Sequence, residues 1–334
     1  MKKLIITDEI SGGRLDKLLF RYLDKAPKSF IYKMLRKKNI LLNGKKASGN
    51  EILCSGDNIV IYFSDAALNE FSTAFFKDDP NETEDRDKQH KTYDLKKFIL
   101  YEDDNILIFN KPSGLLSQKS AASDISADDM LKEYLGSNDF FTPGISNRLD
   151  RNTSGIMMAG KNPNAVRCLN IAVKERALRK YYICIVKGKT EASGELKGFL
   201  EKDKNNNSVK ISMEQINRGK AVDTRYELLS SNGYMSVLSI ELITGKTHQI
   251  RAHMASIGHP LAGDVKYGDE RFNRKLKQKY GIKSQMLHAY KVEFSAMPDF
   301  LDYLNGKVIT AAVPKNFLNL MKGEDLCLHG VRED

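Results

Sequence analysis

Cysteine is scarce in this sequence, and so are long apolar runs. The four cysteines lie far apart, and no two of them form a CxxC spacing. This argues against a disulfide framework and against a structural zinc site. The apolar run near the first residue, LII, is far shorter than that of a signal peptide, and no later run approaches membrane-spanning length. We therefore expect a reduced, cytoplasmic protein with no membrane segment.

Several motifs of cofactor-dependent and metal-dependent enzymes are also missing. The sequence contains neither a GxGxxG fingerprint nor a Walker loop, which excludes the usual nucleotide-cofactor folds. His248, His253 and His259 are close in sequence but lack the HExxH arrangement of a helical zinc site. Ser154 lies in no GxSxG elbow, and Cys184 has apolar neighbours, so both are expected in turns or packing. The sequence predicts no cofactor and no metal.

Positive charge is plentiful but unevenly distributed. The 334 residues include 53 Lys and Arg against 43 Asp and Glu, and the net charge of +10 suggests an acidic partner such as nucleic acid or an anionic membrane. Residues 11–63 contain 11 basic and 4 acidic side chains, whereas residues 64–96 contain 5 and 9. A basic module is thus followed by an acidic segment, which we interpret as a linker.

Apolar spacing in the basic module indicates a small folded domain. Residues 14–26 and 28–37 have the periodicity of short amphipathic helices. ILLNGKKA contains Asn43-Gly44, the strongest short hairpin signal, and DNIVIYF is a further β-rich run. The predicted order is helix, helix, hairpin and strand.

The rest of the chain indicates a larger domain of mixed structure. After residue 96, short β-rich runs alternate with turns, and helical periods appear only at 126–135, 163–178 and 247–258. The predicted fold class is α+β, with a mixed, mainly antiparallel large domain. The expected boundaries are 11–63 for the small domain, 64–96 for the linker and 97–325 for the large domain.

The order of elements in residues 11–63 resembles the small RNA-binding domain named after ribosomal protein S four. In that family a basic helix faces the RNA. On composition alone, a solvated basic face explains the cations equally well, and the resemblance favours RNA. Six residues would neutralise phosphates with little base specificity: Lys33, Arg36, Lys37, Lys38, Lys45 and Lys46.

The stretch SNRLDRNTSG places one carboxylate, Asp150, between Arg148 and Arg151. Such a carboxylate can form a structural ion pair, or it can stay ionised beside a phosphate-rich substrate. The Arg-x-Asp-Arg pattern alone fits both roles. The surrounding sequence is needed to distinguish them.

This stretch resembles the central motif, usually HRLDxxTSG, of the pseudouridine synthases of the RluA/RluC/RluD group. The resemblance extends over nearly the whole chain outside the linker. It implies an isomerase that detaches uracil from its ribose, rotates it and rejoins it through carbon without a cofactor. The group's other signatures stand in the right order: NKPSGLL at 110–116, KYYICIVKG at 180–188, GKTHQIRAHM at 245–254, HPLAGDVKYG at 259–268 and LHAYKVEF at 287–294.

The resemblance implies roles for four residues. Asp150 is the attacking carboxylate, and Arg251 keeps it ionised, since arginine does not lose its charge. Tyr182 stacks on the flipped base and helps to move a ribose proton, whereas Tyr181 points to the opposite strand face. Arg148 fills the gap that the uridine leaves in its stack, or contacts a phosphate. The alternatives are core packing for the tyrosine and a purely structural Asp–Arg pair.

Five further residues are expected to support the pocket: Lys111, Asn147, Lys246, His248 and Gln249. Lys111 belongs to a turn at the pocket rim, with a structural role and a substrate contact equally well supported. Two of the five depart from the group's pattern, because Asn147 replaces the usual His and Lys246 the frequent Arg. Asn cannot titrate, so no general acid is needed there, and Lys keeps the charge without the bidentate geometry.

Members with such an N-terminal module mostly modify large-subunit ribosomal RNA, so we expect that substrate rather than transfer RNA, and no DNA. The alternatives are a transfer-RNA-directed synthase and a non-catalytic RNA-binding ribosome-assembly factor. A hydrolase that releases uracil fits less well, because glycosidases usually need two acting carboxylates and only one is evident near the motif. We expect a monomer. The target positions cannot be read from side-chain order.

Overall fold

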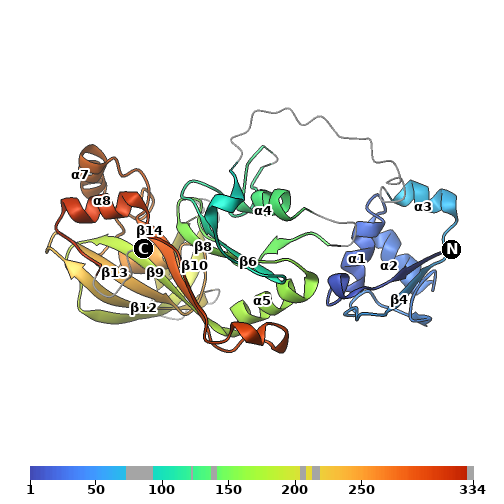
Figure 1. The fold of residues 1–334 in the computed structure, drawn as a ribbon. Coiled ribbons are helices and arrows are strands. Elements are labelled where there is room, and N and C mark those ends of the chain that lie inside the picture. The colour runs from blue at the N-terminus through green and yellow to red at the C-terminus, as the bar shows by residue number, and fades with distance from the viewer. Residues whose placement is uncertain (73–92, 122, 137–140, 204–207, 213–218, 329–334) are drawn as a thin grey trace.

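The computed structural model describes two folded units, which Figure 1 shows as a blue N-terminal unit and a larger green-to-red unit. The described residues are 1–72, 93–121, 123–136, 141–203, 208–212 and 219–328. None of the helices in this part of the chain has the length and apolar character that a membrane crossing requires.

The N-terminal unit is a small sheet covered by helices. Its strands lie in the order β1-β4-β2-β3, and all of their pairings are antiparallel. The buried faces of α1 and α2 meet the sheet in one apolar core. The elements are β1 (Lys2–Ile5), α1 (Leu15–Tyr22), α2 (Lys28–Arg36), β2 (Ile40–Leu42), β3 (Lys45–Lys46), β4 (Asn58–Ile61) and α3 (Asp65–Phe71).

The predicted hairpin is present between β2 and β3. Asn43 and Gly44 connect the strands with φ of 49° and 72°. A two-residue turn with two positive φ angles matches the twist of the flanking strands, and Asn-Gly tolerates it best. Here the sequence pattern and the structure agree.

The N-terminal unit is larger than the sequence indicated. β1 lies before residue 11 and completes the sheet by pairing with β4. α3 lies inside the range 64–96 expected as linker, yet its Leu68 is fully buried in the N-terminal core. Phe71 adds a ring contact with Phe30 at 4.8 Å between centroids. The acidic composition of the segment hid this short helix, and residues 73–92, most of the expected linker, lie outside the described residues.

The larger unit is built on one mixed sheet of eleven described strands. The main path is β11-β10-β12-β13-β9-β14-β8-β6-β5, with β15 paired to β14 and β7 to β8. Every pairing is antiparallel except that of β14 with β8, so the prediction of a mixed, mainly antiparallel sheet is confirmed. The strands are β5 (Ile99–Glu102), β6 (Ile106–Lys111), β7 (Gly144–Ile145), β8 (Ser154–Gly160), β9 (Leu178–Lys187), β10 (Ser193–Asp203), β11 (Ser208–Ser212), β12 (Lys220–Ser231), β13 (Met235–Leu242), β14 (Leu287–Phe294) and β15 (Val308–Thr310).

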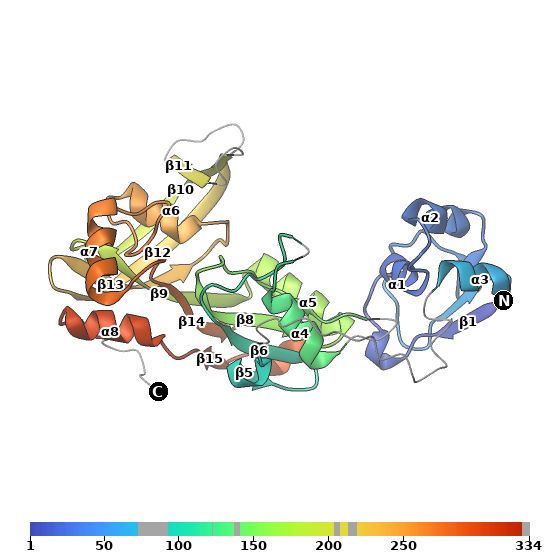
Figure 2. The same ribbon diagram turned by 90° about the horizontal axis from the view of Figure 1, so that it is seen from above.

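Helices cover both faces of this sheet. Alternate residues of β9 pack to opposite sides: Tyr182 and Cys184 toward α4 and α6, and Ile183 toward α7 and α8. α5 packs against β6 and β8, and their apolar side chains form a third core. Figure 2 shows α7 and α8 at one end of the unit, away from α4 and α5. The helices are α4 (Ala127–Leu135), α5 (Pro163–Glu175), α6 (Gln249–Ser256), α7 (Glu270–Tyr280) and α8 (Lys315–Gly323).

The parallel contact between β8 and β14 lies directly behind the Asp150 turn. Ser154 pairs with His288 and Gly155 with Ala289. Gly155 has a φ of 115°, and a Cβ there would overlap the Ala289 backbone. Ser154 Oγ also lies 2.9 Å from His288 Nδ1. The close approach of the two backbones therefore requires glycine.

We predict that Gly155→Ala lowers the free energy of unfolding by about 3 kcal/mol or more, because both the φ angle and the neighbouring backbone exclude a side chain. Gly144→Ala in β7 is the matched control, since a Cβ there meets nothing within 4 Å. It should cost less than about 1 kcal/mol. Guanidinium denaturation of both variants measures this, and equal stabilities would contradict the account of the β8–β14 contact.

Candidate active site

Asp150 lies in the connection between β7 and β8, which side chains fix on both flanks. Asn147 donates from Nδ2 to the carbonyl of Ile156 (3.1 Å) and accepts from the Met158 amide (2.8 Å). On the other flank, Ser117 Oγ accepts from the Leu149 amide (3.0 Å) and donates to its carbonyl (2.7 Å). The turn closes with a bond from the Thr153 amide to the Asp150 carbonyl. The carboxylate therefore sits on an anchored backbone.

The geometry also explains the asparagine at position 147. Its side chain must accept from one backbone group and donate to another, and a neutral carboxamide does both without titrating. The position holds β8 in place, so it needs no acid or base.

Arg251 links Asp150 to a second carboxylate, Asp264. Arg251 is 6% exposed on α6, and its Nη1 donates to Asp150 Oδ2 at 3.0 Å. Its Nε and Nη2 donate to the two oxygens of Asp264 at 2.7 and 2.9 Å. The guanidinium group also lies 5.2 Å from the ring centroid of Tyr267. Arg251 is thus held bidentately from behind and bonds Asp150 through one nitrogen.

Asp264 is ionised although it is almost fully buried. Burial alone would raise the pKa of this carboxyl, but the hydrogen bonds and charge of Arg251 outweigh burial and hold the pKa below its usual value. The backbone amides of Lys266 and Tyr267 also donate to Asp264 Oδ1. For Arg251, burial would lower the pKa, and its contacts with Asp264 and Asp150 raise it. The pair is therefore charged at neutral pH.

Asp150 keeps one carboxylate oxygen available. Both of its contacts, with Arg251 and with His248 Nε2 at 3.8 Å, are to Oδ2. Among the described residues, Oδ1 has no hydrogen-bond partner. His248 has a φ of 56° and contacts the Tyr267 hydroxyl through Nδ1 at 3.0 Å. Burial lowers the pKa of His248 despite the opposing charge of Asp150, so it is mostly neutral at pH 7.

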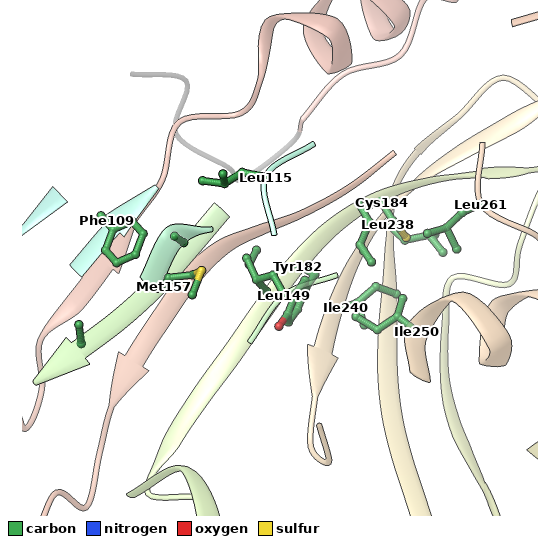
Figure 3. Packing of buried hydrophobic residues seen from close by; sticks show 14 of the residues in the cluster. Phe109, Leu115, Leu149, Met157, Tyr182, Cys184, Leu238, Ile240, Ile250 and Leu261 are labelled. Carbon is green, nitrogen blue, oxygen red and sulfur yellow. The ribbon is translucent and has the colours of Figure 1, made fainter. Parts of the chain in front are cut away.

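Tyr182 forms the apolar side of the site. It is 6% exposed on β9, and Figure 3 shows its ring beside Leu149 and Ile240. Burial, with a smaller effect of the Asp150 charge, raises the pKa of its hydroxyl well above the usual value. Tyr181 points to the other face and donates to Glu293 at 3.2 Å, as the strand alternation predicted. Tyr182 therefore both packs in a core and faces the site.

Lys111 supports the turn after Asp150 from behind. It is fully buried, and its Nζ donates to the carbonyls of Pro112 (3.0 Å), Leu115 (2.7 Å) and Arg151 (3.1 Å). Burial lowers the pKa of its ammonium group to about 7, opposed by the charge of Asp150. The expected position of Lys111 at the pocket rim is wrong, because Lys111 does not line the large cavity. Its three N–H groups all donate to backbone carbonyls.

Most of the predicted residues surround one cavity of about 610 Å³, a size typical of ligand sites. Arg148 and Lys246 are exposed at its rim. Gln249 is buried beneath it and fixes the preceding loop: its oxygen accepts from Thr244 and from the Lys246 amide, and its nitrogen donates to Asp223 and Thr224. The lining includes Asn147, Arg148, Asp150, Tyr182, Lys246, His248, Gln249 and Arg251. The six N-terminal cations do not line this cavity.

The three histidines of the 248–259 region have separate partners. His253 Nδ1 lies 2.8 Å from Thr224 Oγ1, and burial lowers its pKa to about 4. His259 Nδ1 lies 2.9 Å from the Lys187 carbonyl. Within the described residues, no group of three or more His, Cys, Asp or Glu is arranged to hold a metal ion.

The sequence reasoning missed Asp264 and Tyr267, which hold Arg251 and His248. Both belong to the quoted stretch HPLAGDVKYG, residues 259–268. The signal was present, because a buried arginine that keeps its charge needs a carboxylate partner in addition to a reacting one.

Comparison with known proteins shows the family of this chain. The sequence model of the RNA pseudouridylate synthase family matches residues 105–256. The ribosomal large subunit pseudouridine synthase C of Vibrio vulnificus (strain CMCP6) is 32% identical over 291 residues, which is 87% of this chain and 87% of that protein. Its counterpart from Escherichia coli (strain K12) is 30% identical over 308 residues, covering 88% and 89%. The chain belongs to the RNA pseudouridylate synthase family.

The fold is shared as well. The structure of human RNA Pseudouridylate Synthase Domain Containing 4 aligns with a TM-score of 0.57 at 19% identity, over 72% of this chain and 96% of that one. The sequence comparisons confirm the predicted resemblance to the pseudouridine synthases, and the enzyme is an isomerase that converts uridine to pseudouridine. The resemblance of the N-terminal unit to the domain named after ribosomal protein S four stays a prediction.

We predict that Asp264→Asn lowers the free energy of unfolding by about 3–5 kcal/mol at neutral pH, because it leaves Arg251 buried with a weakened partner. The folded-state pKa of Asp264 is depressed, so its contribution is present above the unfolded value near 3.8 and is lost as pH falls through the lower folded value. The difference from wild type should therefore shrink only below about pH 4.

Denaturation curves at a series of pH values measure this difference. Asp302→Asn, at an exposed position, is the control and should change stability by less than about 0.5 kcal/mol. A loss in Asp264→Asn no larger than that of the control would mean that Arg251 is held by other contacts.

Proposed function

We propose that the enzyme isomerises uridines in large-subunit ribosomal RNA, with Asp150 as the attacking carboxylate. The observation that carries the proposal is the Asp150–Arg251 contact at 3.0 Å, with Oδ2 engaged and Oδ1 available at the cavity. The names of the relatives, ribosomal large subunit pseudouridine synthase C, support the choice of RNA.

The chemistry follows from the groups at the cavity. Asp150 attacks C1′ of the ribose or C6 of the base, and the bond between N1 and C1′ breaks. The detached uracil rotates, C5 bonds to C1′ and the bond to Asp150 breaks. C5 then loses its proton, and N1, which no longer bonds the ribose, gains one. The product is an isomer of the substrate, so no oxidant or other reactant is consumed. The hydroxyl of Tyr182 is neutral, and its ring offers an apolar surface on which the base stacks and turns.

Access to the cavity requires the uridine to leave its RNA stack. Arg148 is exposed beside Asp150, where its side chain can enter the vacated position in the RNA. A phosphate contact is the alternative role for the same side chain. Lys246 is also exposed at the rim, and we assign it a contact with the RNA backbone.

The N-terminal unit is proposed as an RNA-binding domain of the type named after ribosomal protein S four, attached by the acidic linker. Its six predicted cations are all exposed, and none has an acidic partner among the described residues. They lie at the end of α2, in the turn after it and on β3: Lys33, Arg36, Lys37, Lys38, Lys45 and Lys46. In the same proposal, the enzyme is a cytoplasmic monomer. It acts on ribosomal RNA and does not bind DNA.

A uracil-releasing hydrolase fits the site poorly. Such an enzyme needs a second carboxylate to activate water. Asp264 is the nearest candidate, but both of its oxygens bond Arg251 and it is only 1% exposed. It therefore cannot reach a water beside the substrate.

We predict that Asp150→Asn loses at least about 1,000-fold in pseudouridine formation while binding RNA nearly as tightly as wild type, because the nearly isosteric amide cannot attack. Asp104→Asn, exposed and remote from the cavity, is the matched control and should keep full activity. The assay maps carbodiimide-dependent reverse-transcription stops on unmodified large-subunit ribosomal RNA and on bulk transfer RNA.

Wild-type stops in ribosomal RNA that vanish in Asp150→Asn would support both the substrate and the role. Stops only in transfer RNA would change the substrate class. Turnover in Asp150→Asn close to that of the control would remove the carboxylate from the mechanism. Tight ribosomal RNA binding with no stops in wild type would favour the assembly-factor alternative.

We predict that the double variant Lys33→Gln, Arg36→Gln lowers the slope of log binding constant against log salt by about 1.5–2, because two phosphate contacts are lost. The control removes two exposed cations from α8 through Lys315→Gln and Lys322→Gln. Titrations of large-subunit ribosomal RNA at several salt concentrations provide the slopes. Equal slopes in both double variants would exclude α2 from the RNA contacts.

A further inference from the structure

The rim of the catalytic cavity is strongly cationic. Only one carboxylate, Asp150, belongs to its lining, and Arg251 already pairs with it. The cations that remain come from the Asp150 turn, the end of α5, the start of β9 and the loop before α6. They are Arg148, Lys174, Arg176, Lys180 and Lys246.

Lys180 is the member of this set that solvent screens least. It is half-buried at the start of β9, and its ammonium group has no hydrogen-bond or ion-pair partner among the described residues. The loop over it has no side chain at Gly245, where a Cβ would lie 3.5 Å from Lys180 Nζ. Burial lowers the pKa of Lys180, and the nearby charge of Arg176 lowers it further. A cation in this position would gain from an external anion.

Arg176 adds a second charge at the same place. It ends α5 in the left-handed conformation, with a φ of 59°, and its side chain is exposed. No carboxylate of the described residues pairs with it, whereas Lys174 contacts Glu175 at 3.1 Å in an exposed pair. Two neighbouring cations repel each other, and an anion that contacts both offsets this repulsion. Lys180 and Arg176 are therefore neighbouring cations that no carboxylate of the described residues compensates.

The position of this site relative to Tyr182 indicates which anion it takes. Lys180 and Tyr182 lie on the same face of β9, two residues apart, so their Cα atoms are separated by about 6.6 Å. A nucleotide whose base stacks on Tyr182 and whose ribose faces Asp150 carries its phosphates at about this distance from the base.

We propose that Lys180, assisted by Arg176, binds a backbone phosphate that flanks the extruded uridine. This inference rests on the proposed function, because it assumes that the uridine enters the cavity, and it assigns a binding role outside the groups that act on the base. The phosphate contact holds the ribose against Asp150 while the detached uracil turns. C1′ therefore stays in position for its new bond to C5.

The test uses two small probes with the full-length protein: uridine and uridine 3′,5′-bisphosphate, each titrated by NMR. Wild type should bind the bisphosphate at least about 10-fold more tightly than uridine, a gain typical of a charge-assisted phosphate contact. Lys180→Met keeps the apolar stem and should reduce this preference below about 3-fold. Lys180→Arg should keep most of it. Lys322→Met on α8 is the control and should match wild type.

The same variants are then compared on large-subunit ribosomal RNA. Lys180→Met should lower the salt slope of binding by about 0.7, the loss of one single-stranded phosphate contact, and the control should not. An unchanged bisphosphate preference in Lys180→Met, or equal binding of both probes by wild type, would overturn the phosphate site.

Failure of the proposed function gives a different pattern. In that case wild type leaves no reverse-transcription stops on ribosomal RNA, while the nucleotide titrations still report whether Lys180 recognises a phosphate. Stops in wild type together with an unchanged Lys180→Met preference would retain the isomerase and reject only the phosphate site.

Discussion

The guanidinium group of Arg251 is the interaction on which the catalytic site depends. Two of its nitrogens bond Asp264 and one bonds Asp150. Because Asp264 takes the bidentate contact, Asp150 is bound through a single oxygen and keeps the other for the substrate. A direct bidentate pair between Arg251 and Asp150 would have occupied both oxygens. The buried carboxylate thus orients the arginine and limits how strongly it engages the reacting group.

Charge is arranged differently at the centre and at the rim of the cavity. At the centre, Arg251 pairs with two carboxylates, so its positive charge is fully compensated within the protein. At the rim, cations such as Lys180 and Arg176 have no internal carboxylate. The ion-paired centre keeps Asp150 in place before RNA arrives, whereas these rim cations, which have no carboxylate partner in the described part of the chain, gain from a polyanion. The cavity therefore separates reaction at its floor from RNA backbone binding at its edge.

Much of the fold could be predicted from sequence because its signals are local. Asn43-Gly44 specified a hairpin, and alternation in KYYICIVKG placed Tyr181 and Tyr182 on opposite faces. α7 was missed because its charged sequence buries only Phe272 and Leu276. The β10–β11 pair was missed because polar residues and glycines interrupt the apolar alternation of β10, and β10 is instead specified by its pairing with β12.

The site was predictable only in part, for a related reason. Motif order brought Asp150, Arg251 and Tyr182 into one hypothesis, and the structure places them around one cavity. The partner of Arg251 was not evident, because a buried ion pair between residues 13 positions apart leaves no periodic signal. Lys111 was placed at the rim because a turn sequence suggests exposure, while its three carbonyl acceptors arise from backbone that folds around it.

The central claim is that a uridine leaves its RNA and enters this cavity with its ribose at Asp150. A high-resolution structure of Asp150→Asn bound to the ribosomal RNA segment that the wild-type enzyme modifies tests it most directly. We expect the extruded base against Tyr182, and the side chain at position 150 in contact with C1′ or C6 of that nucleotide. A target uridine that remains stacked in the RNA, or that occupies a different pocket, would contradict the account.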